Sequence, residues 1–115
     1  ATQVYAFFSV IQSVCALPGF EPQGAAYNTY RIYARAKDAS PVTSDFKVIF
    51  QNHTDADVAR AITTTTVTAS YAWYNVEYTM IAGDNTDVIY ALVKKATGSA
   101  ANIYIDMIVM VQHYT

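Results

Sequence analysis

Two short segments of the sequence carry clustered aspartate and asparagine side chains, the residue types that supply oxygen ligands. The first segment contains Asp55 and Asp57, and the second contains Asp84, Asn85 and Asp87. Hard cations such as Ca²⁺ bind carboxylate and carbonyl oxygens, so the second segment is the candidate calcium site, and no other cofactor is indicated. The alternative is that these residues form ordinary turns by hydrogen bonding to their own backbone.

Aromatic side chains form a second group. The chain has ten tyrosines and one tryptophan, and Tyr71, Trp73 and Tyr74 lie together where a loop is expected to meet a strand. Exposed rings flanked by polar groups bind sugars, so these three residues are the candidate carbohydrate site. The alternative is that Trp73 anchors the core. Tyr33, which lies between two arginines, is a second candidate of the same kind.

No arrangement of residues indicates catalysis. The two histidines, His53 and His113, lack metal-ligand spacing and no nucleophile motif surrounds them. A hydrolase would need two carboxylates in a cleft, and Asp55 with Asp57 is the one close pair. We therefore expect no catalytic residue and no enzyme activity. The lone Cys15 has no partner for a disulfide within the chain, and we expect a buried small hydrophobe unless it pairs with another chain.

Two features favour an exported chain. Asn52-His53-Thr54 is an N-glycosylation sequon in a predicted loop, with Asn52 as the acceptor. The sequence starts at Ala1 rather than Met, which indicates a processed chain whose leader has been removed. The apolar segment 4–11 is far too short to span a bilayer. We therefore expect an extracellular location, on a cell surface or in a virion.

Composition and charge limit the partners. Hydrophobic residues make up 53% of the chain and charged residues 14%, so we expect some apolar surface to contact a partner. The formal net charge is -2 and the sequence has no basic run. Nucleic acid is therefore not an expected partner, because phosphate binding needs clustered lysine and arginine.

Alternating apolar and polar residues predict strands along most of the chain. The expected strands are 2–12, 30–37, 46–51, 63–70, 73–82, 87–95 and 102–112, separated by loops and turns. The threonine-rich segment 63–70 is expected to be an edge strand or an extended connection, and residues 58–62 fit either a helical turn or a strand. We expect one domain over residues 1–115, an all-β antiparallel sandwich or jelly roll.

The last expected strand is nearly continuous in apolar residues, so both of its faces are expected to be covered. Asp106 interrupts this run. A carboxylate in such surroundings needs a partner, and Arg31 or Arg35 is the expected cation.

The first twelve residues form a candidate assembly strand. Its apolar side chains would lie on both faces of an extended segment; they are Val4, Tyr5, Phe7, Phe8, Val10 and Ile11. A free strand of this kind readily pairs with other chains. It either completes its own sheet or is donated to the sheet of a neighbouring subunit.

The order of elements in the last 45 residues also carries a resemblance. The elements are the threonine-rich segment 63–70, the strand Ala72-Trp73-Tyr74-Asn75-Val76, the apolar strand 87–92, and a closing strand 102–109 that contains Asp106. This part resembles the C-terminal half of the jelly-roll domains that include carbohydrate-binding modules and galactose-binding-like domains. The resemblance implies the fold, whereas similar domains serve as sugar-binding modules, virion proteins and filament subunits.

These observations lead to two hypotheses. The first is a non-enzymatic structural subunit of an extracellular assembly, a surface filament or virion protein that forms a homo-oligomer or polymer through strand and apolar contacts. Low charge and apolar terminal segments motivate it. The alternative is a carbohydrate-binding module that uses exposed tyrosine and tryptophan.

Overall fold

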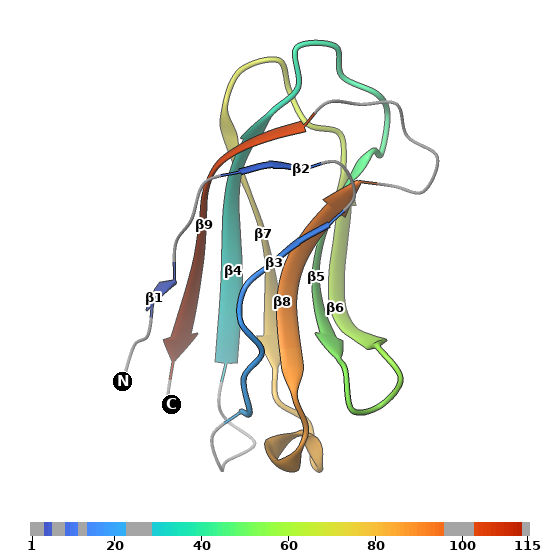
Figure 1. Ribbon diagram of the computed structural model, residues 1–115, viewed down its shortest axis with the longest axis vertical. Helices are drawn as coiled ribbons and strands as arrows, with labels where there is room; N and C mark the ends of the chain where they lie inside the picture. The colour runs from blue at the N-terminus through green and yellow to red at the C-terminus, as the bar shows by residue number, and fades with distance from the viewer. Residues whose placement is uncertain (1–3, 6–8, 12–13, 23–28, 96–102, 114–115) are drawn as a thin grey trace.

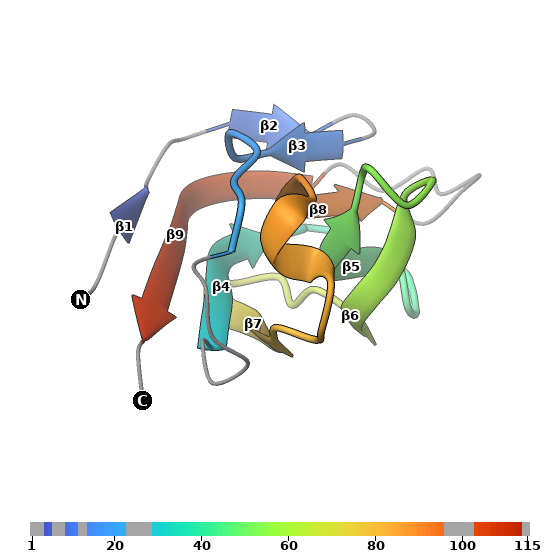
Figure 2. The same cartoon turned by 90° about the horizontal axis from the view of Figure 1, so that it is seen from below.

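The structure is a computed structural model that describes residues 4–5, 9–11, 14–22, 29–95 and 103–113, by backbone alone before residue 16 and at residue 113. Two β-sheets pack face to face (Figures 1 and 2). The first sheet contains β1 (Val4–Tyr5), β2 (Ser9–Ile11), β9 (Ile103–His113), β4 (Thr29–Lys37) and β7 (Ala72–Thr79). The second contains β3 (Val14–Ala16), β8 (Ile89–Lys95), β5 (Phe46–Asn52) and β6 (Val58–Thr65). A short 3₁₀ helix, η1 (Asp84–Thr86), lies between β7 and β8.

The order of the strands is that of a jelly roll. In the first sheet β2 pairs with β9, and β9 and β7 flank β4; in the second sheet the order is β3-β8-β5-β6. All neighbouring strands are antiparallel. The chain thus crosses between the sheets at most connections, as jelly rolls require. The predicted fold class, an all-β antiparallel sandwich, is confirmed.

The core lies between the sheets and is built by strict alternation. Along β4 every second residue is buried, because successive side chains of a strand point to opposite faces. Aromatic rings fill the centre. Tyr78 packs against Tyr30 at 5.7 Å and against Phe50 at 5.4 Å between ring centroids, and Phe20 packs on Tyr30 at 4.9 Å. Burying each such ring contributes about 1.5–3 kcal/mol, so packing holds this fold together.

A β-bulge interrupts the last strand. The register between β4 and β9 runs from Arg35 opposite Met107 to Ala36 opposite Ile105, so β9 contains one extra residue at Asp106. The pairing on the other side of β9 shifts by one residue over the same stretch, between Tyr5 opposite Met110 and Ser9 opposite Ile105. Bulges bend a strand and increase its twist, which accounts for the curvature of β9 in Figure 1.

The bulge also changes the burial pattern along β9. Before and after the bulge, buried and more exposed side chains alternate, with Ile105 and Ile108 buried; at the bulge itself, Asp106 and Met107 are both only partly buried. The prediction that both faces of this strand are covered is wrong for the outer face, where Tyr104 is exposed. The continuous apolar run therefore reflects an apolar outer surface as well as the core.

The candidate assembly strand pairs with its own chain. β1 and β2 both lie antiparallel to β9, so in this structure the segment completes its own sheet. Phe7 and Phe8 lie outside the described residues, as do the side chains of Val4, Tyr5, Val10 and Ile11. Cys15 lies in β3 opposite Val93, and its side chain is likewise outside the described part.

The threonine-rich region forms an edge, as predicted, but the strand begins earlier. β6 covers Val58–Thr65, so residues 58–62 belong to a strand and 66–70 to the connection that follows. β6 pairs with β5 alone and leaves its other side unpaired by any described strand. Small polar side chains suit this position because an exposed apolar edge favours aggregation.

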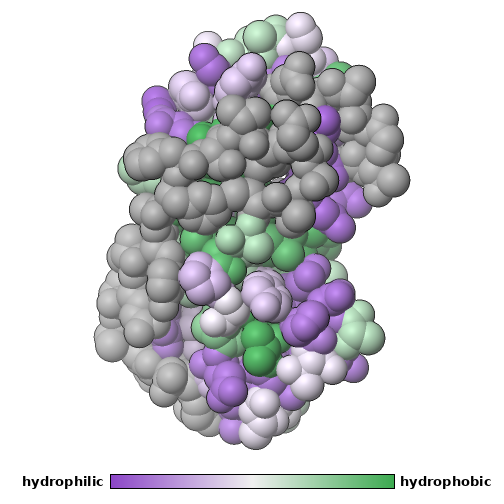
Figure 3. Space-filling model, in the orientation of Figure 1, coloured by the Kyte–Doolittle hydropathy of each residue, from purple (hydrophilic) through white to green (hydrophobic). Residues whose placement is uncertain are grey.

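Apolar side chains reach the surface outside the core. The large hydrophobic residues that are exposed are Val42, Val58, Ile62, Tyr71, Trp73, Ile81 and Tyr104. On the side drawn in Figure 3, a hydrophobic area near the middle of the molecule adjoins hydrophilic side chains below it. Within the described ranges the protein has no helix with the length and hydropathy to cross a bilayer.

Candidate ligand-binding face

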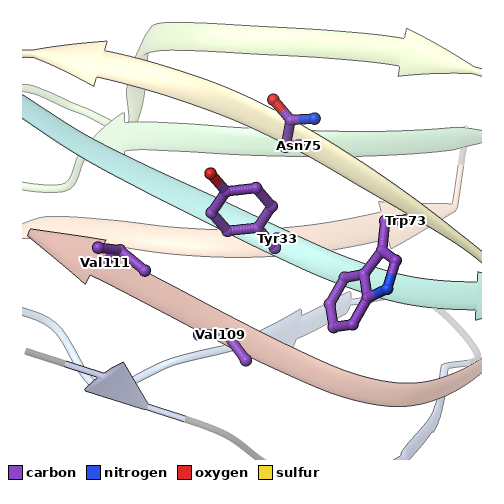
Figure 4. A pocket seen from close by; sticks show the side chains of 5 residues that line it. All are labelled: Tyr33, Trp73, Asn75, Val109 and Val111. Atoms are coloured by element: carbon purple, nitrogen blue, oxygen red, sulfur yellow. The ribbon is translucent and has the colours of Figure 1, made fainter.

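An open depression lies on the outer face of the first sheet, away from the core. It has a volume of about 450 Å³ and is lined by Tyr33, Trp73, Asn75, Val109 and Val111. These side chains come from three adjacent strands, β4, β7 and β9, and project from the same side of the sheet (Figure 4). The lining is predominantly apolar, with one amide and one phenol to form hydrogen bonds.

The register of the sheet brings these residues together. Tyr33 on the central strand lies opposite Asn75 of β7 and opposite Val109 of β9. Trp73 lies two residues before Asn75 on β7, and Val111 lies two residues after Val109 on β9. Residues two apart on one strand share a face. Long-range pairing therefore forms the depression.

The two aromatic rings of the depression meet edge to face. The ring centroids of Tyr33 and Trp73 are 6.5 Å apart and the ring planes are inclined by 85°. Trp73 remains 50% exposed, so one of the largest side chains of the chain is left on the surface. This exposure argues against the alternative that Trp73 anchors the core.

A row of polar groups borders the rings. Arg31 donates hydrogen bonds from Nη1 to Asn75 Oδ1 at 2.5 Å and from Nη2 to Glu77 Oε2 at 2.6 Å. These bonds hold the amide and the carboxylate in fixed orientations beside the depression. Aromatic surface next to oriented polar groups is the combination that recognises a sugar ring, which has apolar faces and hydroxyl edges.

Tyr71 lies beyond Trp73 and contacts two cations. The Arg35 guanidinium carbon is 4.6 Å and the Lys37 ammonium nitrogen 4.8 Å from the centre of its ring. Arg35 also forms an ion pair with Asp106 at the bulge. The predicted cation partner of Asp106 is thus confirmed as Arg35.

Tyr74 does not join the depression, although it was predicted together with Tyr71 and Trp73. Adjacent residues of a strand point to opposite faces, so Tyr74 turns inward and packs against Phe46 with 5.7 Å between ring centroids. Its hydroxyl accepts a hydrogen bond from the backbone N–H of Thr68 at 3.0 Å. Tyr74 therefore stabilises the fold and does not face the ligand side.

The predicted calcium cluster at Asp84, Asn85 and Asp87 is held by protein groups instead. Asp84 is 1% exposed, and Arg60 donates to both of its carboxylate oxygens at 3.1–3.2 Å. Tyr78 donates to Asp84 Oδ2 at 2.5 Å. A guanidinium supplies the positive charge that a metal ion would supply, so we do not retain this cluster as a metal site.

Burial and hydrogen bonding act in opposite directions on Asp84. Burial alone would raise the pKa of its carboxyl, but hydrogen bonds from Arg60, Tyr78 and Asn52 outweigh that effect and lower the pKa below the usual aspartate value. The same arrangement raises the pKa of the Tyr78 phenol, first because it is buried and second because it donates to a carboxylate. Asp84 is thus an ionised carboxylate, and Tyr78 is a neutral phenol that donates a hydrogen bond to it.

The predicted glycosylation at Asn52 is wrong for the folded protein. Asn52 is the last residue of β5, has no exposed surface, and donates from Nδ2 to Asp84 Oδ1 at 3.0 Å and to Asp87 Oδ2 at 2.8 Å. An acceptor amide has to be exposed to carry a glycan. The loop that was predicted from these polar residues begins after Asn52.

The carboxylates of Asp55 and Asp57 each form an ion pair with a basic side chain. Asp55 pairs with Arg60 at 3.3 Å, and Asp57 pairs with His53 Nδ1 at 2.8 Å. In the part of the chain that is described, no group of three or more His, Cys, Asp or Glu side chains is arranged to hold a metal. The side chain of His113 lies outside the described residues.

Sequence reasoning named Tyr33 and Trp73 separately and missed Asn75, Val109 and Val111. One signal was present, because apolar residues occupy both faces of the last strand although that strand needs only one face for the core. An apolar outer face on a strand next to tyrosine and tryptophan indicates a binding surface.

Comparison with known proteins supports the fold. No family model matches the sequence, and no curated protein matches it. A CBM4 carbohydrate-binding module superposes with a TM-score of 0.63 at 18% sequence identity, over 97% of this chain and 78% of that one. The fold resembles that of carbohydrate-binding modules. Because the match covers nearly the whole chain, the resemblance is not confined to the C-terminal half.

Other solved structures share this sandwich at lower similarity. The apo form of a cyclase from Fischerella sp. has a TM-score of 0.60 at 8% identity, over 89% of this chain and 56% of that one. The arabinose-bound α-L-arabinofuranosidase MgGH51 has a TM-score of 0.51 at 16% identity, over 97% of this chain and 23% of that one. The chain thus spans about half the length of the cyclase and a quarter of the arabinofuranosidase. At these identities the likeness concerns the fold alone.

Proposed function

We propose that this domain is a non-enzymatic, extracellular carbohydrate-binding module, and that the face formed by β4, β7 and β9 holds the glycan. The observation that carries the proposal is the exposed edge-to-face pair of Tyr33 and Trp73 beside the oriented amide of Asn75. Burying half of a tryptophan ring against a sugar yields favourable apolar contact. The neighbouring amide, guanidinium and carboxylate offer donors and acceptors to hydroxyl groups.

The dimensions of the depression agree with this proposal. A volume of about 450 Å³ lies within the usual range of small-molecule sites, and the depression is open along the sheet. The side chains that line it are a phenol, an indole, an amide and two isopropyl groups, with no carboxylate, imidazole or thiol among them. The face is therefore suited to binding rather than to bond cleavage. Likeness to a carbohydrate-binding module and to a domain of an arabinofuranosidase supports the same reading.

A structural role in an assembly is the second candidate. The observation that favours it is the edge strand β6, which presents Val58 and Ile62 at 44% and 49% exposure next to a main-chain edge that no described strand covers. Edge pairing between copies would use this strand. In such an assembly β1 and β2 would stay paired with β9 of their own chain, as they are in this structure.

Glycan binding by matched variants tests the proposal. The wild type, Trp73→Ala and Ile62→Ala are compared on a glycan array and by affinity electrophoresis in polysaccharide gels. Trp73 and Ile62 are both about half exposed and lie on different sheets, so Ile62→Ala controls for the loss of a surface hydrophobic group. We expect a monomer that binds a glycan, an affinity at least about tenfold lower in Trp73→Ala, and no change in Ile62→Ala.

Two outcomes contradict the proposal. A dispersed monomer that binds no glycan would remove its basis, and equal binding by both variants would place the site elsewhere. Loss of large assemblies in Ile62→Ala, seen by light scattering, would instead support the structural role.

A further inference from the structure

Cations and aromatic rings gather at one end of the outer face of the first sheet, next to Trp73. Arg35 lies opposite Trp73 in the pairing of β4 with β7. Lys37 is two residues further along β4, so it shares this face with Arg35. Tyr104 of β9 lies opposite Lys37, and Tyr71 directly precedes β7; both tyrosines are exposed. The face that contains the depression therefore continues into a cluster of different character.

Two cationic side chains converge on the ring of Tyr71. The Arg35 guanidinium carbon is 4.6 Å and the Lys37 ammonium nitrogen 4.8 Å from the ring centre. The negative face of an aromatic ring attracts cations, so Tyr71 holds both side chains at this end of the sheet. Two like charges near one ring also repel each other. An anion placed beside them would relieve that repulsion.

The arginines of this face are already neutralised within the protein. Arg31 forms an ion pair with Glu77 at 2.6 Å, and Arg35 forms one with Asp106 at the bulge. Each guanidinium on the outer face of the first sheet thus has one carboxylate. These two pairs leave the face without net charge, so any excess has to come from the remaining cation.

Lys37 is that remaining cation. The described part of the chain includes all nine acidic residues, and Lys37 forms an ion pair with none of them. Asp38 is the next residue, but it is 3% exposed and does not pair with Lys37. The outer face therefore keeps one positive charge beside Tyr71, although the chain as a whole carries a formal charge of -2.

We infer that the glycan bound by this face is acidic, and that an anionic group of one sugar lies beside Lys37 and Tyr71 while an adjoining sugar packs on Trp73. The lysine ammonium group offers three hydrogen-bond donors, and hydrogen bonds between charged groups are about twice as strong as neutral ones. A carboxylate or a sulfate fits this chemistry. The assignment rests on the proposed glycan-binding function and names the class of its ligand.

A glycan array with neutral, uronate-bearing and sulfated glycans identifies the best ligand of the full chain. We expect an acidic ligand, and its class separates carboxylate from sulfate. Calorimetry then compares this ligand with its carboxyl-reduced or desulfated counterpart, which should bind about three- to tenfold more weakly. The difference should diminish in about 1 M NaCl, where charges are screened beyond about 3 Å.

Matched lysine variants locate the anionic group. Lys37→Gln should weaken binding of the acidic ligand about three- to tenfold and leave binding of the neutral counterpart unchanged. Lys37→Arg keeps the charge and should retain most of the affinity. Lys94→Gln is the control, because Lys94 is also partly exposed and lies in β8 of the second sheet. It removes the same charge at a distance from the face and should change nothing.

The possible failures are distinguishable. Binding of neutral glycans that depends on Trp73 and not on Lys37 would overturn the acidic specificity and leave the proposed function intact. Equal weakening by Lys37→Gln and Lys94→Gln would also overturn it, because only the net charge would then matter. Absence of binding to every glycan would remove the proposed function and this specificity together.

Discussion

Asn52 Nδ2 lies 3.0 Å from Asp84 Oδ1, and this hydrogen bond joins two buried side chains, one from a strand of the second sheet and one from the turn that follows the first sheet. Asn52 ends β5, whereas Asp84 opens the 3₁₀ helix that follows β7. The same amide also binds Asp87. One side chain thus fixes the turn that leads from the first sheet into β8.

Replacing Asn52 with alanine should destabilise the domain by about 1–3 kcal/mol, because Asp84 loses a buried donor. Urea unfolding followed by tryptophan fluorescence measures the change. Asn85→Ala is the control, since Asn85 lies in the same turn but is exposed. Equal stability of the two variants would show that the Asn52 amide contributes nothing to the fold.

Stability should fall in acid through Asp84. Its pKa is lowered in the folded state, so the stabilisation from its ionised form is fully present above the unfolded aspartate pKa of about 3.9. That contribution is lost as the pH falls from there through the lower pKa of the folded state. Urea unfolding between pH 7 and pH 2 should show this loss for the wild type, and a smaller loss for Asp84→Asn. A wild type and an Asp84→Asn protein with parallel pH profiles would contradict this assignment.

The ring of Tyr33, rather than its hydroxyl, should carry its part of the glycan contact. Tyr33→Ala should lower glycan affinity about five- to tenfold, since it removes half of the edge-to-face pair with Trp73. Tyr33→Phe should retain most of the affinity. Calorimetry with the best ligand from the array distinguishes the two, and a Tyr33→Phe protein as weak as Tyr33→Ala would transfer the role to the hydroxyl.

Removal of residues 1–12 should produce a less stable protein that self-associates, because it uncovers the edge of β9. We expect the full chain to be a monomer by light scattering. A synthetic peptide of residues 1–12 should restore both stability and the monomeric state. Large assemblies of the full chain that the truncation abolishes would show instead that this segment is exchanged between subunits.

Strands whose apolar and polar residues alternate could be predicted closely from the sequence. The expected segments 30–37 and 46–51 agree within one residue with Thr29–Lys37 and Phe46–Asn52, because alternation is strong there. β6 was placed too late, since Val58 and Ile62 are exposed. Their side chains break the usual relation between apolar character and burial, so periodicity alone could not decide this segment.

Residue type alone indicated two members of the candidate site, whereas the way they are brought together depends on the register of the sheet. Trp73 and Tyr33 stood out because large rings at strand positions are suited to binding, but nothing in the local sequence indicates that they meet. Their contact depends on the pairing of β4 with β7, which lie about 40 residues apart in the chain. The burial of Asp38 and Asp45 could not be predicted for a different reason, because aspartates in turn-like segments are usually exposed.

Among the described residues, the depression on β4, β7 and β9 is an open hollow that is lined by side chains of three adjacent strands. A polymer can therefore lie across it with its backbone continuing in both directions, so the reducing and non-reducing ends need not be available. The proposed module would then recognise internal segments of a polysaccharide, and each long chain would offer many equivalent overlapping positions. Apparent affinity for a polymer would accordingly increase with its length, because a longer chain offers more binding positions even when the sugar units in the depression make the same contacts.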